Sequence, residues 1–150
     1  MKELDLSFNK ISDVGVLRKV KFYKLEKLEL CYNKIFNIIM LESDNFKQLK
    51  ELNLYHNKIS DINVLKDVKF DNLEILNLGY NLISDISILE HTSFKQLKEL
   101  NLSFNEIVSI KVIEKVKFDK LKTLNLNGNN KSTSKSNSSI ISRLKFDIYY

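Results

Sequence analysis

The chain repeats one pattern of apolar and polar positions every 24 residues. Three segments, at 49–59, 73–83 and 97–107, show it without adjustment as LxxLxLxxNxI. The period is marked by asparagines at Asn9, Asn33, Asn57, Asn81, Asn105 and Asn129. Self-similarity at a fixed period of this length is the signature of a repeat array. The sequence therefore predicts about six stacked units that form a single domain over residues 1–150.

Each unit contains two apolar series with different spacing. The LxL core, as in Leu76 and Leu78, alternates with polar positions, which is typical of a strand with one buried face. Stacked units then form a parallel sheet. A second series follows the asparagine at intervals of three, as in Ile83, Ile86 and Leu89, and predicts a short helical or 3₁₀ segment. Ser-Asp pairs precede this segment in three units, and these residue types cap helix starts.

Two further registers have structural interpretations. A phenylalanine recurs on the return leg, at Phe22, Phe46, Phe70, Phe94 and Phe118. An aromatic at every turn is expected to fill the core between the helical wall and the sheet. The six asparagines carry both donor and acceptor atoms. We predict that they form a ladder that bridges backbone groups of neighbouring turns.

The ends of the array differ from its middle. Residue 2 already lies inside a repeat, so we expect an open edge on the first strand. Residues 131–139 are too polar to pack and are predicted to form a flexible loop. Residues 140–150 regain apolar character and are predicted to be a C-terminal capping segment, in which 144–147 form a convex leg and 148–150 cover the last core leucines.

The LxxLxLxxNxI pattern resembles the leucine-rich-repeat family over residues 1 to about 130. NKISDI at 57–62 resembles internalin-type repeats and is similar to those of the leucine-rich regulatory subunit of protein phosphatase type one. The resemblance implies an α/β fold, a right-handed solenoid arc with a concave parallel sheet and short convex helical segments. It also implies protein recognition through concave and rim aromatics. The chain departs from those repeats in its longer period and in lacking proline after ISDI.

Composition narrows the classes of function. No apolar run approaches the ~20 residues of a membrane-spanning helix, and the start lacks a secretory apolar region. A cytoplasmic location without a membrane is therefore expected. Cys31 is the only cysteine, and His56 and His91 lie far apart in sequence, so we expect no disulfide framework, metal or cofactor. With three glycines and no phosphate loop, HExxH or GxSxG, we expect no enzyme. His56 and Cys31 are interpreted as noncatalytic.

The polar positions between the leucines point onto the concave face and supply the candidate binding residues. One register before the ladder asparagines is aromatic in five units, and strands ~4.8 Å apart would align these rings in one stripe. Such a stripe either anchors a partner protein or only shields the strand ends. The predicted partner-binding residues are Phe8, Glu29, Tyr32, Glu51, Asn53, Tyr55, His56, Asn77, Tyr80, Asn101 and Phe104.

Charge is unevenly distributed between this face and the rest of the chain. The whole chain carries a net charge of +5, whereas the concave face holds mostly carboxylates, at Glu3, Asp5, Glu29, Glu51 and Glu99, against Lys27. This favours a partner with a basic surface, although the lysines elsewhere also serve simply to keep the wall soluble. Because those lysines are spread around the outside, nucleic acid is not the expected partner.

The preferred hypothesis is a noncatalytic protein–protein interaction scaffold that binds through the concave face and the aromatic rim. A monomer is expected in that case. The alternative is a structural or assembly element, or a fragment of a longer repeat protein, that associates through its uncapped N-terminal edge.

Overall fold

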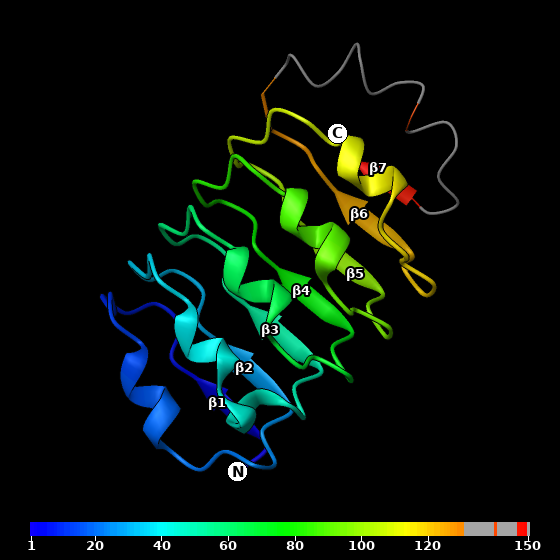
Figure 1. Ribbon diagram of the computed structural model, residues 1–150. Coiled ribbons are helices and arrows are strands. Elements are labelled where there is room, and N and C mark those ends of the chain that lie inside the picture. The colour runs from blue at the N-terminus through cyan, green and yellow to red at the C-terminus, as the bar shows by residue number, and fades with distance from the viewer. Residues whose placement is uncertain (131–139, 141–146, 150) are drawn as a thin grey trace.

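The chain forms a solenoid built on one parallel sheet (Figure 1). The computed structural model describes residues 1–130, 140 and 147–149. The predicted loop at 131–139 and most of the predicted convex leg lie outside the described residues. The strands are β1 (Glu3–Asp5), β2 (Lys27–Glu29), β3 (Glu51–Asn53), β4 (Ile75–Asn77), β5 (Glu99–Asn101), β6 (Thr123–Asn125) and β7 (Asp147–Tyr149). Each strand pairs with the next in sequence order, as the 24-residue period predicts.

Short 3₁₀ helices form the opposite wall, and Figure 1 shows them on one side of the sheet. They are η1 (Gly15–Lys19), η2 (Ile39–Glu42), η3 (Asp44–Phe46), η4 (Asn63–Lys66), η5 (Ser87–His91) and η6 (Lys111–Glu114). Only the last residue of each apolar series lies inside a 3₁₀ helix: Leu89 lies in η5, Ile86 is its N-cap and Ile83 precedes it. The step from Ile86 to Leu89 is a single 3₁₀ turn, in which the Leu89 N–H donates to the Ile86 carbonyl at 3.0 Å.

The core lies between the sheet and the helices and is continuous along the array. Leu52 pairs in register with Leu28 and Leu76, and all three are fully buried. Phenylalanines of the return legs pack in neighbouring pairs, with ring centroids 6.3 Å apart for Phe70 and Phe94. The predicted inward leucines and aromatic spine are confirmed for these turns.

Aspartates start three of the helices. The Asp13, Asp61 and Asp85 carboxylates accept the backbone N–H groups of Gly15, Asn63 and Ser87 at 2.7–2.8 Å. The formal N-cap residues of these helices are Val14, Ile62 and Ile86. The Ser-Asp pairs thus lie immediately before the N-cap residues, and the aspartate stabilises the turn that enters the helix.

The two ends of the sheet differ from its middle. Leu4 and Leu6 are only half-buried, because among the described residues β1 is an edge strand that pairs with β2 on one side. At the other end, Ile148 lies opposite Leu124 in a seventh strand. Residues 147–149 thus extend the sheet by one strand, and Ile148 packs against the core beside Leu124.

Candidate partner-binding surface

The exposed sheet face consists of the outward side chains of β1–β6. Its members are Glu3, Asp5, Lys27, Glu29, Glu51, Asn53, Ile75, Asn77, Glu99, Asn101, Thr123 and Asn125, and their side chains are partly or fully exposed. Residues beyond the strand ends behave differently. Cys31, which the sequence placed on this face, is only 9% exposed, and Ser103 is buried as well. These positions lie where the chain turns into the next leg, so neighbouring turns cover them.

The predicted asparagines on this face also end the strands. The Oδ1 atoms of Asn53, Asn77 and Asn101 accept the N–H group two residues further on, at 3.0–3.2 Å. An asparagine that closes a turn in this way has its oxygen occupied. Their Nδ2 groups remain as donors for a partner, although that of Asn53 already donates one hydrogen bond to Glu29. Asp5 and Asn125 occupy the same register and also accept the N–H group two residues further on. The recurrence of Asp or Asn at this register was therefore a sequence signal for the turn.

Charged residues at the N-terminal half of the face are connected by one lysine. Lys27 Nζ lies 3.3 Å from a Glu29 oxygen and 3.0 Å from a Glu51 oxygen. The hydrogen bonds that Lys27 donates to Glu51, and secondly to Glu29, raise the pKa of the Lys27 ammonium. Glu29 also accepts a 2.7 Å hydrogen bond from Asn53 Nδ2. Carboxylates still outnumber the single lysine, so this half of the face stays acidic.

A second part of the face is nearly uncharged and contains a hollow. The hollow has a volume of about 230 Å³ and lies across β4, β5 and β6. Asn77 and Asn101 line it together with Ile75, Glu99 and Thr123. The last three residues were placed on this face from the sequence but were not included in the predicted binding set. No motif marks them, because only the packing of adjacent strands creates the depression.

The aromatic row forms one continuous stack along the rim. Ring centroids are 4.6 Å apart for Phe8 and Tyr32, 4.7 Å for Tyr32 and His56, 5.8 Å for His56 and Tyr80, and 4.2 Å for Tyr80 and Phe104. All four pairs are stacked, and all five side chains remain exposed. The rings therefore shield one another's faces and present their edges to solvent.

Every member of the row has a left-handed backbone conformation. The φ angles of Phe8, Tyr32, His56, Tyr80 and Phe104 lie between 51° and 56°. Such a conformation costs a bulky residue roughly 1–2 kcal/mol, and stacking recovers about 0.5–1.5 kcal/mol for each ring pair. Gly128 takes the next register with a φ of 72°. A side chain there would meet the Phe104 ring at 2.5 Å, so glycine allows that ring to lie over the backbone.

Tyr55 forms a second layer beside the row. Its ring lies 5.6 Å from that of Tyr32, 6.3 Å from that of His56 and 5.2 Å from that of Tyr80. Burial, followed by the influence of Tyr32, raises the pKa of the Tyr55 hydroxyl. The structure thus brings Tyr32, Tyr55, His56 and Tyr80 into one aromatic cluster, next to the acidic group around Lys27.

The ladder asparagines lie behind the rim and connect consecutive turns. Asn81 is typical, because its Nδ2 donates to the Leu54 and Leu78 carbonyls and its Oδ1 accepts the Ile59 N–H at 3.0 Å. Asn33, Asn57, Asn105 and Asn129 make the equivalent set of bonds. Asn9 is exposed and bonds only within its own turn, to Leu6 and Ser7. The ladder holds the rim in a fixed position.

Other kinds of site were sought over the same residues. Within residues 1–130, 140 and 147–149, no group of three histidine, cysteine or acidic side chains is arranged to hold a metal ion. In that same part of the chain, no helix has both the length and the apolar character needed to cross a bilayer.

Comparisons with known proteins identify the family. The model for tandem pairs of leucine-rich repeats matches residues 47–91 and 95–139, and a single-repeat model matches residues 1–17. A search of curated proteins found no match. The matched repeat-pair segments make up more than half of the chain.

Solved structures with the same fold come from bacteria and plants. An internalin (inlF) from Listeria monocytogenes is 32% identical, with a TM-score of 0.72 over 94% of this chain and 38% of its own. A leucine-rich-repeat protein from Leptospira interrogans is 25% identical, with a TM-score of 0.69 over 100% of this chain and 43% of its own.

The ectodomain of the plant membrane receptor kinase GASSHO1/SCHENGEN3 from Arabidopsis thaliana, in complex with CASPARIAN STRIP INTEGRITY FACTOR 2, is 26% identical. Its TM-score is 0.67 over 87% of this chain and 16% of its own. The chain thus spans less than half the length of these proteins. With its stacked parallel strands, 3₁₀ wall and asparagine-connected turns, the chain belongs to the leucine-rich-repeat family.

Proposed function

We propose that the chain is a noncatalytic scaffold that binds a partner protein through the exposed sheet face and the aromatic row. Leucine-rich-repeat folds generally serve as protein–protein interaction scaffolds. The observation that carries the proposal is the row itself. Five rings are exposed and yet held in fixed positions by stacking and by their backbone conformation. Rigid aromatics with little entropy to lose are favoured anchors of interfaces.

The charge of the face favours a basic partner surface. Glu29 and Glu51 adjoin the aromatic cluster, and the other carboxylates extend the acidic surface toward β1. Opposite charge on the partner would steer association and fix its orientation. The same sign of charge disfavours nucleic acid on this face.

The size of the face limits the strength of binding. Six turns ~4.8 Å apart, each contributing its strand and the residues just after it, roughly five residues in all, cover on the order of 500 Å². A standard stable interface uses about 800 Å² on each partner. The rim is therefore needed to complete the contact area, which again gives weight to the aromatic row.

The solved relatives are consistent with a binding role. The plant ectodomain was solved in complex with a named factor, and we extend protein recognition, as a class of function, to this chain. The cytoplasmic location remains a prediction, because that relative is the ectodomain of a membrane receptor kinase. The absence of enzyme activity is part of the proposal.

The test compares capture of a partner by the wild-type chain and by the double variant Tyr80→Ala/Phe104→Ala. Wild-type chain, used as bait in an extract of its native source, yields candidate partners by mass spectrometry, and affinities are then measured with the purified partner. Hot-spot aromatics typically cost ~2 kcal/mol or more each, so we expect binding to fall by more than about tenfold.

The matched control is Tyr23→Ala, which removes an aromatic that is 62% exposed and lies outside the row. We expect its affinity to equal that of the wild type, while circular dichroism shows all three chains folded. If the double variant and the wild type bind the partner with equal affinity, the binding site does not include these two rings and the proposal is wrong.

A second candidate function is assembly through the outer edge of β1. Leu4, Leu6 and Ile11 are partly exposed there, whereas Leu52, Leu54 and Ile59 at the same registers are fully buried. A further turn of the same kind, from a second copy, would bury them. Sedimentation velocity at increasing concentration tests this, since a chain that stays monomeric at ~100 µM contradicts it.

A further inference from the structure

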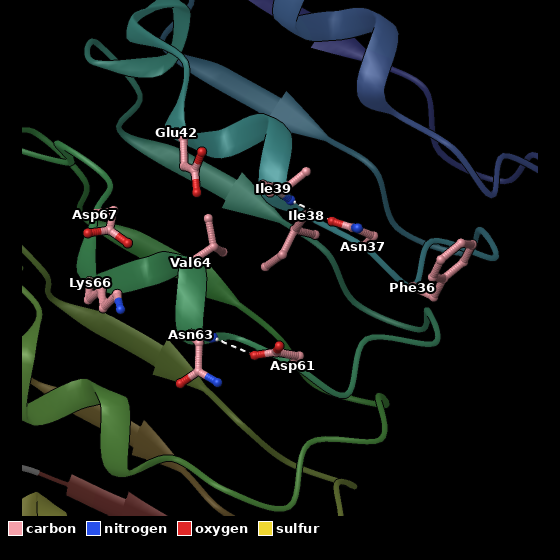
Figure 2. A pocket seen from close by; sticks show the side chains of 10 residues that line it. All are labelled: Phe36, Asn37, Ile38, Ile39, Glu42, Asp61, Asn63, Val64, Lys66 and Asp67. Atoms are coloured by element: carbon pink, nitrogen blue, oxygen red, sulfur yellow. Dashed lines mark hydrogen bonds between the residues drawn. The ribbon is translucent and has the colours of Figure 1, made fainter.

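The helical side of the solenoid carries a second hollow, separate from the one on the sheet face. It has a volume of about 350 Å³ and lies between η2 and η4. Figure 2 shows its lining residues, which come from two consecutive turns. Its apolar wall consists of Phe36, Ile39 and Val64. Because the helices lie on the opposite side of the sheet from its exposed face, a ligand here would not compete with a partner on that face.

The repeats provide an internal comparison for this wall. Phe36 is 59% exposed, and the same register is serine in three other turns, at Ser12, Ser60 and Ser84, and Val108 in a fourth. Ile39 is 45% exposed, and its register holds no apolar side chain elsewhere, with Gly15, Asn63, Ser87 and Lys111. The fold is therefore compatible with small polar residues at both positions. Two departures toward exposed apolar residues lie in one turn and line one hollow, which is typical of a binding site and not of core packing.

The rim of the hollow is acidic. Of its charged lining residues, Glu42, Asp61 and Asp67 are carboxylates and only Lys66 is a cation. Asp61 is occupied, because its Oδ1 accepts the Asn63 N–H at 2.8 Å, and Asn37 likewise accepts the Ile39 N–H (Figure 2). Glu42 and Asp67 are exposed and are the carboxylates that remain available. The hollow is therefore locally acidic, whereas the whole chain has a net charge of +5.

We propose that this hollow is a second binding site, which accepts a short segment of another protein with a lysine or arginine between apolar side chains. The apolar side chains would contact Phe36, Ile39 and Val64, and the cation would lie near Glu42 and Asp67. Charge complementarity selects this occupant, since an acidic or purely apolar segment would leave the two carboxylates without a counter-charge. The volume suits a few side chains and not a folded domain.

The test uses a defined probe, the blocked tripeptide leucine-arginine-leucine, titrated to millimolar concentration against ¹⁵N-labelled chain. We expect amide shifts confined to residues around η2 and η4. Phe36→Ser/Ile39→Asn should weaken binding by about tenfold, because it removes the apolar anchors. Glu42→Gln/Asp67→Asn should weaken it by about twofold to fivefold, the range of exposed charge pairs.

The substitutions in Phe36→Ser/Ile39→Asn are chosen so that the variant still folds. Serine and asparagine already occupy these registers in Ser60 and Asn63, so the variant should keep the wild-type spectrum elsewhere. Val108→Ser is the matched control, because it removes an exposed apolar side chain at the same register in another turn and should bind like the wild type.

Three outcomes would overturn the proposal. They are no shifts around η2 and η4, equal shifts with the blocked tripeptide leucine-glutamate-leucine, or unchanged affinity in the Phe36→Ser/Ile39→Asn variant. The variant Tyr80→Ala/Phe104→Ala should bind the probe normally, so this site and the sheet face can fail independently.

Discussion

The first turn and the fourth turn have the same motif but differ in the environment of almost every residue in it. Leu76 and Leu78 are fully buried, whereas Leu4 and Leu6 are half-buried. Tyr80 is stacked on both of its faces and is 39% exposed, while Phe8 is stacked on one face and is 75% exposed. The contribution of a side chain to the stability of this fold therefore depends more on the neighbouring turns than on the turn that contains it.

The largest difference is expected for the core leucines. Leu76→Ala removes a side chain enclosed by turns on both sides, so it should lower the free energy of unfolding by ~2–5 kcal/mol. Leu4→Ala should cost clearly less, because part of that side chain already contacts water. Urea unfolding measures both. Equal losses would show that the first turn is covered in solution.

For the ladder asparagines, we expect a smaller difference in stability between a variant in the fourth turn and one in the first. Asn81→Ala leaves the buried Ile59 N–H without its acceptor, which costs ~1–3 kcal/mol. The Leu54 and Leu78 carbonyls keep bonds from Asn57 and Asn105, so the loss is limited to about one group. Asn9→Ala should have little effect, because Asn9 bonds only to exposed carbonyls of its own turn. Thermal unfolding of the two variants tests this, and a larger loss for Asn9→Ala would contradict it.

The aromatic row should show the same trend with still smaller values. Tyr80→Ala removes two stacked pairs and the tilted pair with Tyr55, whereas Phe8→Ala removes one stacked pair. At about 0.5–1.5 kcal/mol for each pair, the first variant should lose roughly three times as much stability as the second. Denaturant midpoints at a common slope provide the measurement. A row that contributes nothing to stability would instead make both variants as stable as the wild type.

The smallest effect concerns the ion pairs beside the strands. Glu26 lies between Lys2 and Lys50, at 2.6 and 2.7 Å, and hydrogen bonds from these lysines lower its pKa from 4.5 to about 2. Glu74 bonds to Lys98, and its pKa is also lowered. Because the folded-state pKa of Glu26 is depressed, its stabilising contribution is present above pH 4.5 and is lost as the pH falls toward 2.

The corresponding experiment compares Glu26→Gln with the wild type between pH 7 and pH 2. The wild type should be the more stable chain above pH 4.5, and the difference should disappear as the pH approaches 2. High salt should reduce the difference at neutral pH, because these side chains are exposed to solvent. A difference that grew on acidification would contradict the sign of the pKa shift.

The period, the strand register and the inner leucines could all be predicted from the amino-acid sequence. These follow from a pattern that recurs in each turn, so one reading of LxxLxLxxNxI places Leu52, Leu76 and Leu100 on the same side of one sheet. The position of the aromatic row followed from the same period. Local alternation and a fixed repeat length are sufficient because each turn contacts only its neighbours.

Which contacts each exposed residue can still make depends on how the turns pack against one another. The left-handed backbone of the row, the occupied oxygens of Asn53, Asn77 and Asn101, and the burial of Cys31 depend on contacts between turns. Residues 147–149 form a strand that pairs with the outer edge of β6, although their sequence contains no LxL motif. The hollow beside Phe36 likewise arises between two turns. Side-chain partners and cavities are properties of neighbours in space, and a one-dimensional pattern does not specify them.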